Sequence, residues 1–191
     1  MNEIKNIISE SISLKQSLLN NDVIVDTIQQ VTQTVIECFK KGNRVWFCGN
    51  GGSAADAQHL AAEFSGRFYK DRKALPSEAL HCNTSYLTAV ANDYGYEHVY
   101  ERLLEGVGQK GDVLFGISTS GNSLNIVNAF KKAKEIGITT VGLTGINEGK
   151  MSPLSNFIIN VPSEITPRIQ EMHILVGHII CELTEKELFK D

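Results

Sequence analysis

The chain lacks several features that mark particular classes of protein. Its cysteines have no CxxC spacing, so neither a zinc ribbon nor a thioredoxin-like redox motif is predicted. Their neighbours are mainly apolar, which favours buried free thiols. No apolar run is long enough to cross a bilayer, so we expect no membrane partner. The four cysteines are Cys38, Cys48, Cys82 and Cys181.

An excess of positive charge is also missing. Lysine and arginine number 18 against 22 acidic residues, a net charge of −4, which predicts no nucleic-acid partner and no polybasic membrane surface. The first residues, MNEIK, do not form a charged-then-apolar signal segment, so we expect a cytoplasmic location. With 42% hydrophobic and 21% charged residues, the 191-residue chain is expected to form one domain over 1–191, with residues 1–41 as N-terminal helices.

Short apolar runs alternate with segments of helical period along the rest of the chain. Continuously apolar strands separated by helices are typical of a parallel sheet that is covered on both faces. The pattern therefore predicts an α/β fold, a doubly wound, flavodoxin-like parallel sheet flanked by helices, with an N-terminal helical extension. In such folds ligands bind at the carboxyl ends of the strands. The predicted strands are 45–48, 80–82, 113–117, 138–143 and 157–161, and a long helix is predicted over 166–188.

A glycine-rich turn, residues 49–53, joins the first predicted strand to an alanine-rich helix. This arrangement directs backbone N–H groups and the positive end of a helix dipole towards an anion. Ser53 is expected to be the N-cap or to join the anion site. His59 and Glu63 are four residues apart, so both project from one face of the helix as an acid–base or metal-binding pair.

A second strand-to-helix turn, residues 118–123, carries four hydroxyl groups in six positions. Uncharged hydroxyls and amides so close together are suited to a monophosphate, although helix capping by Ser120 or Ser123 is the alternative. No Walker lysine follows, which argues against nucleoside triphosphate chemistry. The first turn fits G-x-G-x-x-A, but the carboxylate expected at the end of the next strand of a dinucleotide site is missing.

Three sequence blocks, GNGGSAADAQH, GISTSGNS and RIQEMHILVGH, resemble those of the phosphoheptose isomerase family in the sugar isomerase (SIS) domain superfamily. The similarity extends over essentially the whole chain. It implies an aldose–ketose isomerase that converts D-sedoheptulose 7-phosphate to D-glycero-D-manno-heptose 7-phosphate for bacterial surface heptose. It also implies one zinc ion per subunit and a homotetramer with active sites at subunit interfaces.

The resemblance also implies roles for individual residues. Glu63 is then the base at carbon, and His178 is the partner acid–base. However, a residue bound tightly to zinc is a poor proton acceptor. The zinc is therefore either catalytic, with ligands that exchange, or partly structural. Pro167 stands where some relatives carry aspartate. The implied zinc ligands are His59, Glu63, Gln170 and His178; the phosphate ligands are Ser53, Ser118, Thr119, Ser120 and Ser123; and the other substrate-binding residues are Asn50, Gly51, Gly52, Glu63, Asn92, Asp93 and Gln170.

Some of these assignments depend on the resemblance alone. Spacing does not favour His178 over His173, and Asn92–Asp93 is otherwise a plain turn. We expect His81 and His98 to be structural. Two alternative functions are a tetrameric, non-catalytic scaffold that binds a replication initiator, and a sugar-phosphate-sensing module. The retained zinc and acid–base residues argue against the first, and the lack of a DNA-binding domain argues against the second.

Overall fold

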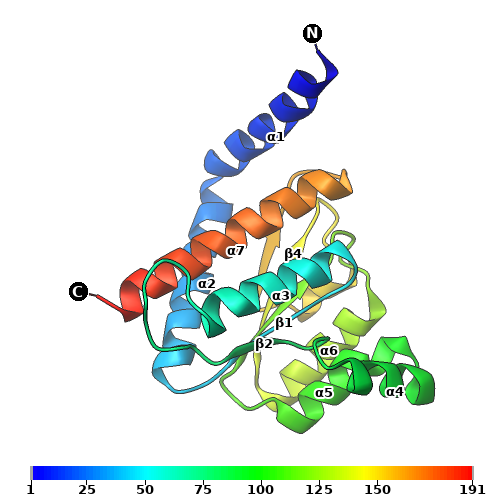
Figure 1. Ribbon diagram of the computed structural model, residues 1–191. Helices are drawn as coiled ribbons and strands as arrows, with labels where there is room; N and C mark the ends of the chain where they lie inside the picture. Colours follow the sequence, from blue (N-terminus) through cyan, green and yellow to red (C-terminus); the bar gives the residue numbers. More distant parts are fainter. Residues whose placement is uncertain (1, 191) are drawn as a thin grey trace.

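A computed structural model describes residues 2–190 and contains a parallel sheet with helices on both faces (Figure 1). The strand order is β2-β1-β3-β4-β5, and every neighbouring pair is parallel. This confirms the predicted doubly wound α/β fold. The strands are β1 Val45–Gly49, β2 Ser77–Ala79, β3 Val113–Ile117, β4 Thr139–Thr144 and β5 Phe157–Asn160.

The helices divide between the two faces of the sheet. The core on one face is formed with α2, α3 and α7, and the core on the other with α4, α5 and α6. The α-helices are α1 Glu3–Leu19, α2 Asp22–Lys40, α3 Gly52–Ser65, α4 Thr84–Tyr94, α5 Val99–Val107, α6 Leu124–Ile136 and α7 Thr166–Leu188. Two 3₁₀ helices are η1 Tyr96–His98 and η2 Gly149–Leu154. No helix among residues 2–190 is both long and apolar enough to cross a membrane.

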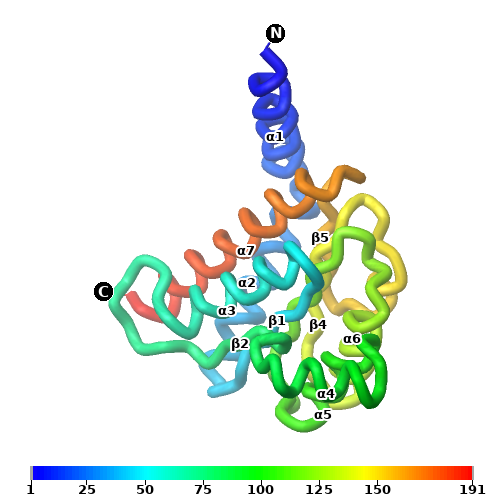
Figure 2. The backbone as a smooth tube through the Cα atoms, turned by 45° about the vertical axis from the view of Figure 1, so that its right-hand side comes forward, coloured from blue at the N-terminus to red at the C-terminus, as the bar shows by residue number. Residues whose placement is uncertain are grey.

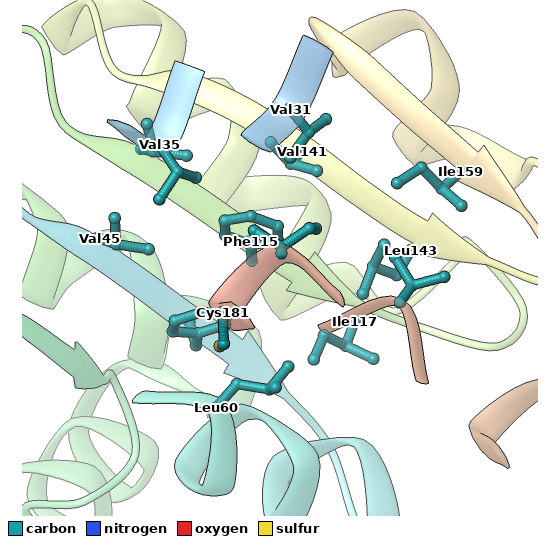
Figure 3. Close-up of a cluster of buried hydrophobic side chains, with 14 of the residues drawn as sticks. Val31, Val35, Val45, Leu60, Phe115, Ile117, Val141, Leu143, Ile159 and Cys181 are labelled. Carbon is teal, nitrogen blue, oxygen red and sulfur yellow. The ribbon is translucent and has the colours of Figure 1, made fainter. Parts of the chain in front are cut away.

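Apolar side chains from the strands meet those of α2, α3 and α7 in a buried cluster (Figure 3). Phe115 of β3 stacks on Phe47 of β1 with ring centroids 4.9 Å apart. Leu60 of α3 and Cys181 of α7 lie in the same cluster. This shared core fixes α3 and α7 side by side, and both helices carry residues of the candidate site.

Two details of the sequence prediction were wrong. Residues 80–82 are a turn and not a strand, because β2 ends at Ala79 and the Cys82 N–H donates to the Ala79 carbonyl at 3.2 Å. Cys82 is exposed, whereas the other three thiols are buried as expected.

The N-terminal helix α1 projects away from the sheet (Figure 2). Its C-terminal half touches the start of α7: Ser11 donates to Glu171 at 2.8 Å, and Leu14 packs against a small apolar cluster there. Ile4, Ile8 and Ile12 are each more than half exposed. The apolar residues on this face of the helix are therefore left largely uncovered in the protomer.

Candidate active site

The first strand-to-helix turn bends at Gly51, whose φ of +56° lies in the left-handed region that favours glycine. Gly51 is the N-cap residue, and α3 begins at Gly52. The expectation of Ser53 as the N-cap was wrong, because the positive φ at Gly51 turns the chain before Ser53. Ser53 is instead buried in the first turn of α3, at the end where the helix dipole is positive.

In the second turn, the hydroxyl groups lie close together and do not cap α6. The Ser118 Oγ lies 3.0 Å from the Ser123 Oγ and 3.4 Å from the Ser120 Oγ. Ser123 is the N-cap residue of α6, but its side chain makes no capping hydrogen bond. Ser120 and Thr119 line a pocket of about 360 Å³ beside this turn. The hydroxyl cluster and the positive end of α6 therefore offer neutral donors to a phosphate group.

The two turns are joined by a pair of asparagines. Asn50 and Asn125 donate to each other, with distances of 3.0 and 2.8 Å. The Tyr96 hydroxyl donates to the Asn50 Oδ1 at 3.2 Å, and the buried Tyr100 hydroxyl donates to the Gly49 carbonyl at 2.5 Å. Sequence analysis missed these contacts of Asn125, Tyr96 and Tyr100, since nothing in the local pattern pairs them with the glycine turn.

Three ionisable side chains meet between α3 and α7. The His59 Nε2 lies 3.0 Å from the Glu63 Oε1 and 3.1 Å from the His178 Nε2. One donor atom from each of the three lies within 4.8 Å of the others. Two of these residues are one helical turn apart on α3, and the third comes from the neighbouring helix, so the packing of the two helices creates the group.

This group fits a metal ion. Zinc with four nitrogen or oxygen ligands at about 2.1 Å holds the donor atoms about 3.4 Å from one another. The separations of 3.0 and 3.1 Å are close to that spacing. His59, Glu63 and His178 could therefore hold a metal ion, with a further position for water or substrate.

Asp56 lies near the same three-residue group, and sequence analysis did not predict this position for it. Burial raises the pKa of Asp56, and the nearby His59 and His178 act in the opposite direction. Its Oδ2 is buried and has no hydrogen-bond partner within residues 2–190. An unpartnered carboxylate oxygen beside two imidazoles also fits a cation at this group. Asp56 precedes His59 by one helical turn, and that spacing could have indicated its place.

Gln170 lies at the other end of the α3–α7 contact. A Cβ atom at Gly52 would come within 2.5 Å of the Gln170 Nε2, so the absence of a side chain at Gly52 admits this amide to the first turn. His178 lies about 12 Å further along α7, from the rise of 1.5 Å per residue. In the protomer, Gln170 is therefore beside the N-terminal end of α3, and the histidine group is farther along.

The structure also shows that His178 and His173 have different surroundings, which their spacing in the sequence alone could not show. His173 is fully buried, and its Nε2 lies 3.1 Å from the Thr144 carbonyl oxygen. Burial lowers the pKa of His173 to about 4, and the hydrogen bond to Thr144 offsets this only in part. His173 is thus a neutral core residue.

Other predicted site residues lie at the surface of the protomer. Asn92 and Asp93 are exposed in the last turn of α4, where the Asn92 Nδ2 donates to the Asp93 Oδ1 at 2.8 Å. Over residues 2–190, no other hydrogen bond involves either side chain. Pro167 occupies the first turn of α7, where a proline costs no intrahelical hydrogen bond.

Comparisons with known proteins place the chain among sugar isomerases. Residues 10–145 match the family model described as the SIS domain. The chain is 54% identical over 182 residues to a phosphoheptose isomerase of Clostridium acetobutylicum, with 95% of this chain and 93% of that one covered.

Two solved structures are similar along nearly their whole length. A phosphoheptose isomerase from Francisella tularensis has a TM-score of 0.92 at 30% identity, covering 97% of each chain. The phosphoheptose isomerase of Neisseria gonorrhoeae has a TM-score of 0.89 at 40% identity, covering 96% of this chain and 97% of the other. The sequence blocks, the fold and these full-length similarities agree, and the chain belongs to the phosphoheptose isomerase family of SIS-domain enzymes.

Proposed function

We propose that this isomerase interconverts D-sedoheptulose 7-phosphate and D-glycero-D-manno-heptose 7-phosphate for bacterial heptose synthesis. The observation that carries the proposal is the meeting of Glu63 and His178 at one position between α3 and α7. An aldose–ketose isomerisation needs a base at carbon and a second group that moves a proton between two oxygens. The names of the relatives, about 50% identical over most of the chain, supply the substrate.

In the proposed reaction, the Glu63 carboxylate removes a proton from C1 of the ketose while His178 donates a proton to the carbonyl oxygen at C2. The resulting 1,2-enediol returns the O1 proton to His178 and takes the proton from Glu63 at C2, which gives the aldose. No net proton is gained or lost. The Glu63 carboxylate has two oxygens and about four lone-pair positions, so one oxygen can bind a cation while the other accepts a proton.

The substrate phosphate is assigned to the hydroxyls of the second turn and the first turn of α3. Ser118, Ser120 and Ser123 are already clustered, and Thr119 belongs to the same turn. Ser53 lies in the first turn of α3, which follows β1, the strand next to β3. Asn50, Gly51, Gly52 and Gln170, with Asn92 and Asp93, are assigned to the sugar hydroxyls.

Zinc is the proposed metal, held by His59, Glu63 and His178. The resemblance implies Gln170 as the fourth ligand, and since Gln170 of the same protomer lies about 12 Å along α7 from His178, this ligand would come from another copy of the chain. Bound zinc would polarise the sugar carbonyl and so acidify the neighbouring C–H group. The donor spacing and the unpartnered Asp56 oxygen support a cation at the three-residue group.

A homotetramer with active sites between subunits completes the proposal. Glu63 lies about 16 Å along the axis of α3 from Gly52, whereas a heptose spans only about 10 Å from C1 to phosphorus, given bonds near 1.5 Å. This separation favours a site in which the phosphate turn and the acid–base pair come from different copies. The exposed isoleucines of α1 and an apolar groove of about 470 Å³ between α2 and α7 offer surfaces for assembly. Because anionic sugar phosphates do not cross bilayers unaided, we assign the reaction to the cytoplasm.

The scaffold and the sensing module have no support among the relatives described above, which carry the isomerase name.

The test is an isomerase assay on sedoheptulose 7-phosphate with metal-stripped protein, zinc-reloaded protein and a Glu63→Gln variant. We expect turnover that follows zinc loading and falls by at least about 10³-fold in Glu63→Gln, the scale of a lost acid–base group. Glu135→Gln, at an exposed position on α6, is the matched control and should leave turnover unchanged.

Turnover that is indifferent to zinc would retain the isomerase but overturn the catalytic role of the metal. No turnover under any metal loading, with the assembly intact, would overturn the enzyme assignment.

A further inference from the structure

A buried ion pair ties the α3–β2 loop, residues 66–76, to α7. The Arg72 Nε lies 2.9 Å from the Glu185 Oε2, and the two side chains are only 2% and 3% exposed. The Glu185 carboxylate also accepts hydrogen bonds from the backbone N–H groups of residues 68–70, at 3.1, 2.7 and 2.9 Å. Four donors thus converge on one carboxylate, and the path of the loop is fixed from α7.

The same arginine also holds the C-terminal end of α3. The Arg72 Nη2 donates to the Glu63 carbonyl oxygen and the Nη1 to the Phe64 carbonyl oxygen, both at 2.8 Å. These are among the carbonyls that a helix leaves without intrahelical partners at its end. Arg72 therefore connects the backbone of the proposed base to a side chain of the helix that carries His178.

The loop brings an aromatic ring to His178. The Phe68 ring centroid lies 5.7 Å from that of His178, with an angle of 49° between the ring planes, and Phe68 also packs against the buried core. The His59 ring is the other aromatic neighbour of His178, at 5.2 Å. An imidazole between two ring neighbours has fewer available rotamers than one facing solvent.

We propose that Phe68 is a positioning residue for His178, and that the Arg72–Glu185 pair acts through it by fixing the loop against both helices. Phe68 limits the rotation of the His178 imidazole, and Arg72 fixes the end of α3 that carries Glu63. The relative placement of base and acid is thereby set by residues that do not touch the substrate. This inference rests on the proposed roles of Glu63 and His178.

The test compares Phe68→Ala with Phe68→Tyr, which keeps the ring, and with Lys73→Ala, a control at an exposed position of the same loop. We expect kcat of Phe68→Ala to fall about 10- to 100-fold, since small misplacements of catalytic groups have effects of this size. KM should stay within about twofold, because the phosphate ligands are distant. Phe68→Tyr should restore most of kcat, and Lys73→Ala should match the parent protein.

A second readout does not depend on activity. In protein labelled with ¹³C-histidine, the His178 ring signal is assigned from a His178→Gln variant among the five histidines of the chain. Its relaxation order parameter should fall in Phe68→Ala, where the ring is free to rotate, and stay unchanged in Lys73→Ala. A kcat within twofold of the parent, or an unchanged His178 order parameter, would overturn the proposal. If the parent protein does not isomerise the heptulose phosphate, the proposed function fails, and the order parameter alone still decides the positioning of the ring.

The ion pair is tested with Glu185→Gln and Arg72→Lys, which conserve shape or charge. Both should lower kcat and lower the same His178 order parameter. If either variant fails to fold, the Phe68 variants still decide the proposal. Folded variants with the parental kcat and order parameter would overturn the part assigned to the pair.

Discussion

At the scale of single residues, α7 gives its two histidines opposite properties. His173 is enclosed by the core, and burial lowers its pKa to about 4, whereas His178 is partly exposed beside His59. The sequence places both on one helix, five residues apart, and contains no indication of which one faces the core. That difference arises from the way α7 rotates against the sheet, which depends on all of its apolar positions together.

A pH-dependent stability follows for His173. Its pKa in the folded protein is lower than the 6.5 of an unperturbed histidine, so the unfolded chain binds more protons between these values. Stability should therefore be full above about pH 6.5 and should decline as the pH falls towards 4, by about 3 kcal/mol from this residue alone.

Urea unfolding between pH 4 and 7 would measure this loss. His173→Gln should be less stable than the parent at pH 7 and should show a flatter profile below pH 6.5. An unchanged profile in the variant would assign the acid sensitivity to other groups.

At the scale of elements, the Gln170 amide of α7 lies against the first turn of α3 because Gly52 has no side chain. A methyl group at this position would displace the Gln170 amide, which can move because it ends a flexible side chain. Gly52→Ala should therefore leave the thermal midpoint unchanged or slightly raised, since alanine favours helix by up to about 1 kcal/mol. The value of kcat/KM should fall about tenfold, the equivalent of one lost hydrogen bond.

Gly106→Ala is the matched control, because a Cβ atom there meets nothing within 4 Å in α5. It should keep parental kcat/KM. Equal activity in both variants would exclude a role for the position of Gln170.

Elements also show how far the sequence alone could lead. The strands β1, β3, β4 and β5 and the long helix were predicted nearly to the residue, because continuous apolar runs and the helical period are local properties. The α3–β2 loop has a mainly polar sequence with neither a helical nor a strand period. Its conformation is set by Glu185, more than a hundred residues away in the chain, so no local pattern could have indicated it. Without the family resemblance, the contact between His59 and His178 could not have been predicted either, because 119 positions separate them in the chain.

At the scale of the whole molecule, α1 extends from the body of the protomer (Figures 1 and 2), and several of its apolar side chains are exposed. Ile4, Ile8 and Ile12 repeat at four-residue intervals and lie on one face of the helix. An exposed apolar stripe has an unfavourable free energy in water, so we expect another protein surface to cover it.

The proposed tetramer predicts that Ile8→Lys combined with Ile12→Lys will reduce the molar mass measured by light scattering. Helical content should stay the same, because α1 has its own N-cap at Asn2 and lysine is a good helix former. Val107→Lys, at an exposed apolar position at the end of α5, is the control and should keep the parental mass. A double variant with the parental mass would remove this face of α1 from the assembly.

The position of α7 after the last strand has a consequence for protein synthesis. A growing chain that has emerged as far as β5 contains every strand of the sheet, but it has neither His178 nor Glu185. The ribosome therefore releases the framework first and the residues that complete the candidate site last. A chain interrupted between β5 and α7 would carry both strand-to-helix turns and Glu63, but it would lack His178 and could not complete the proposed acid–base pair.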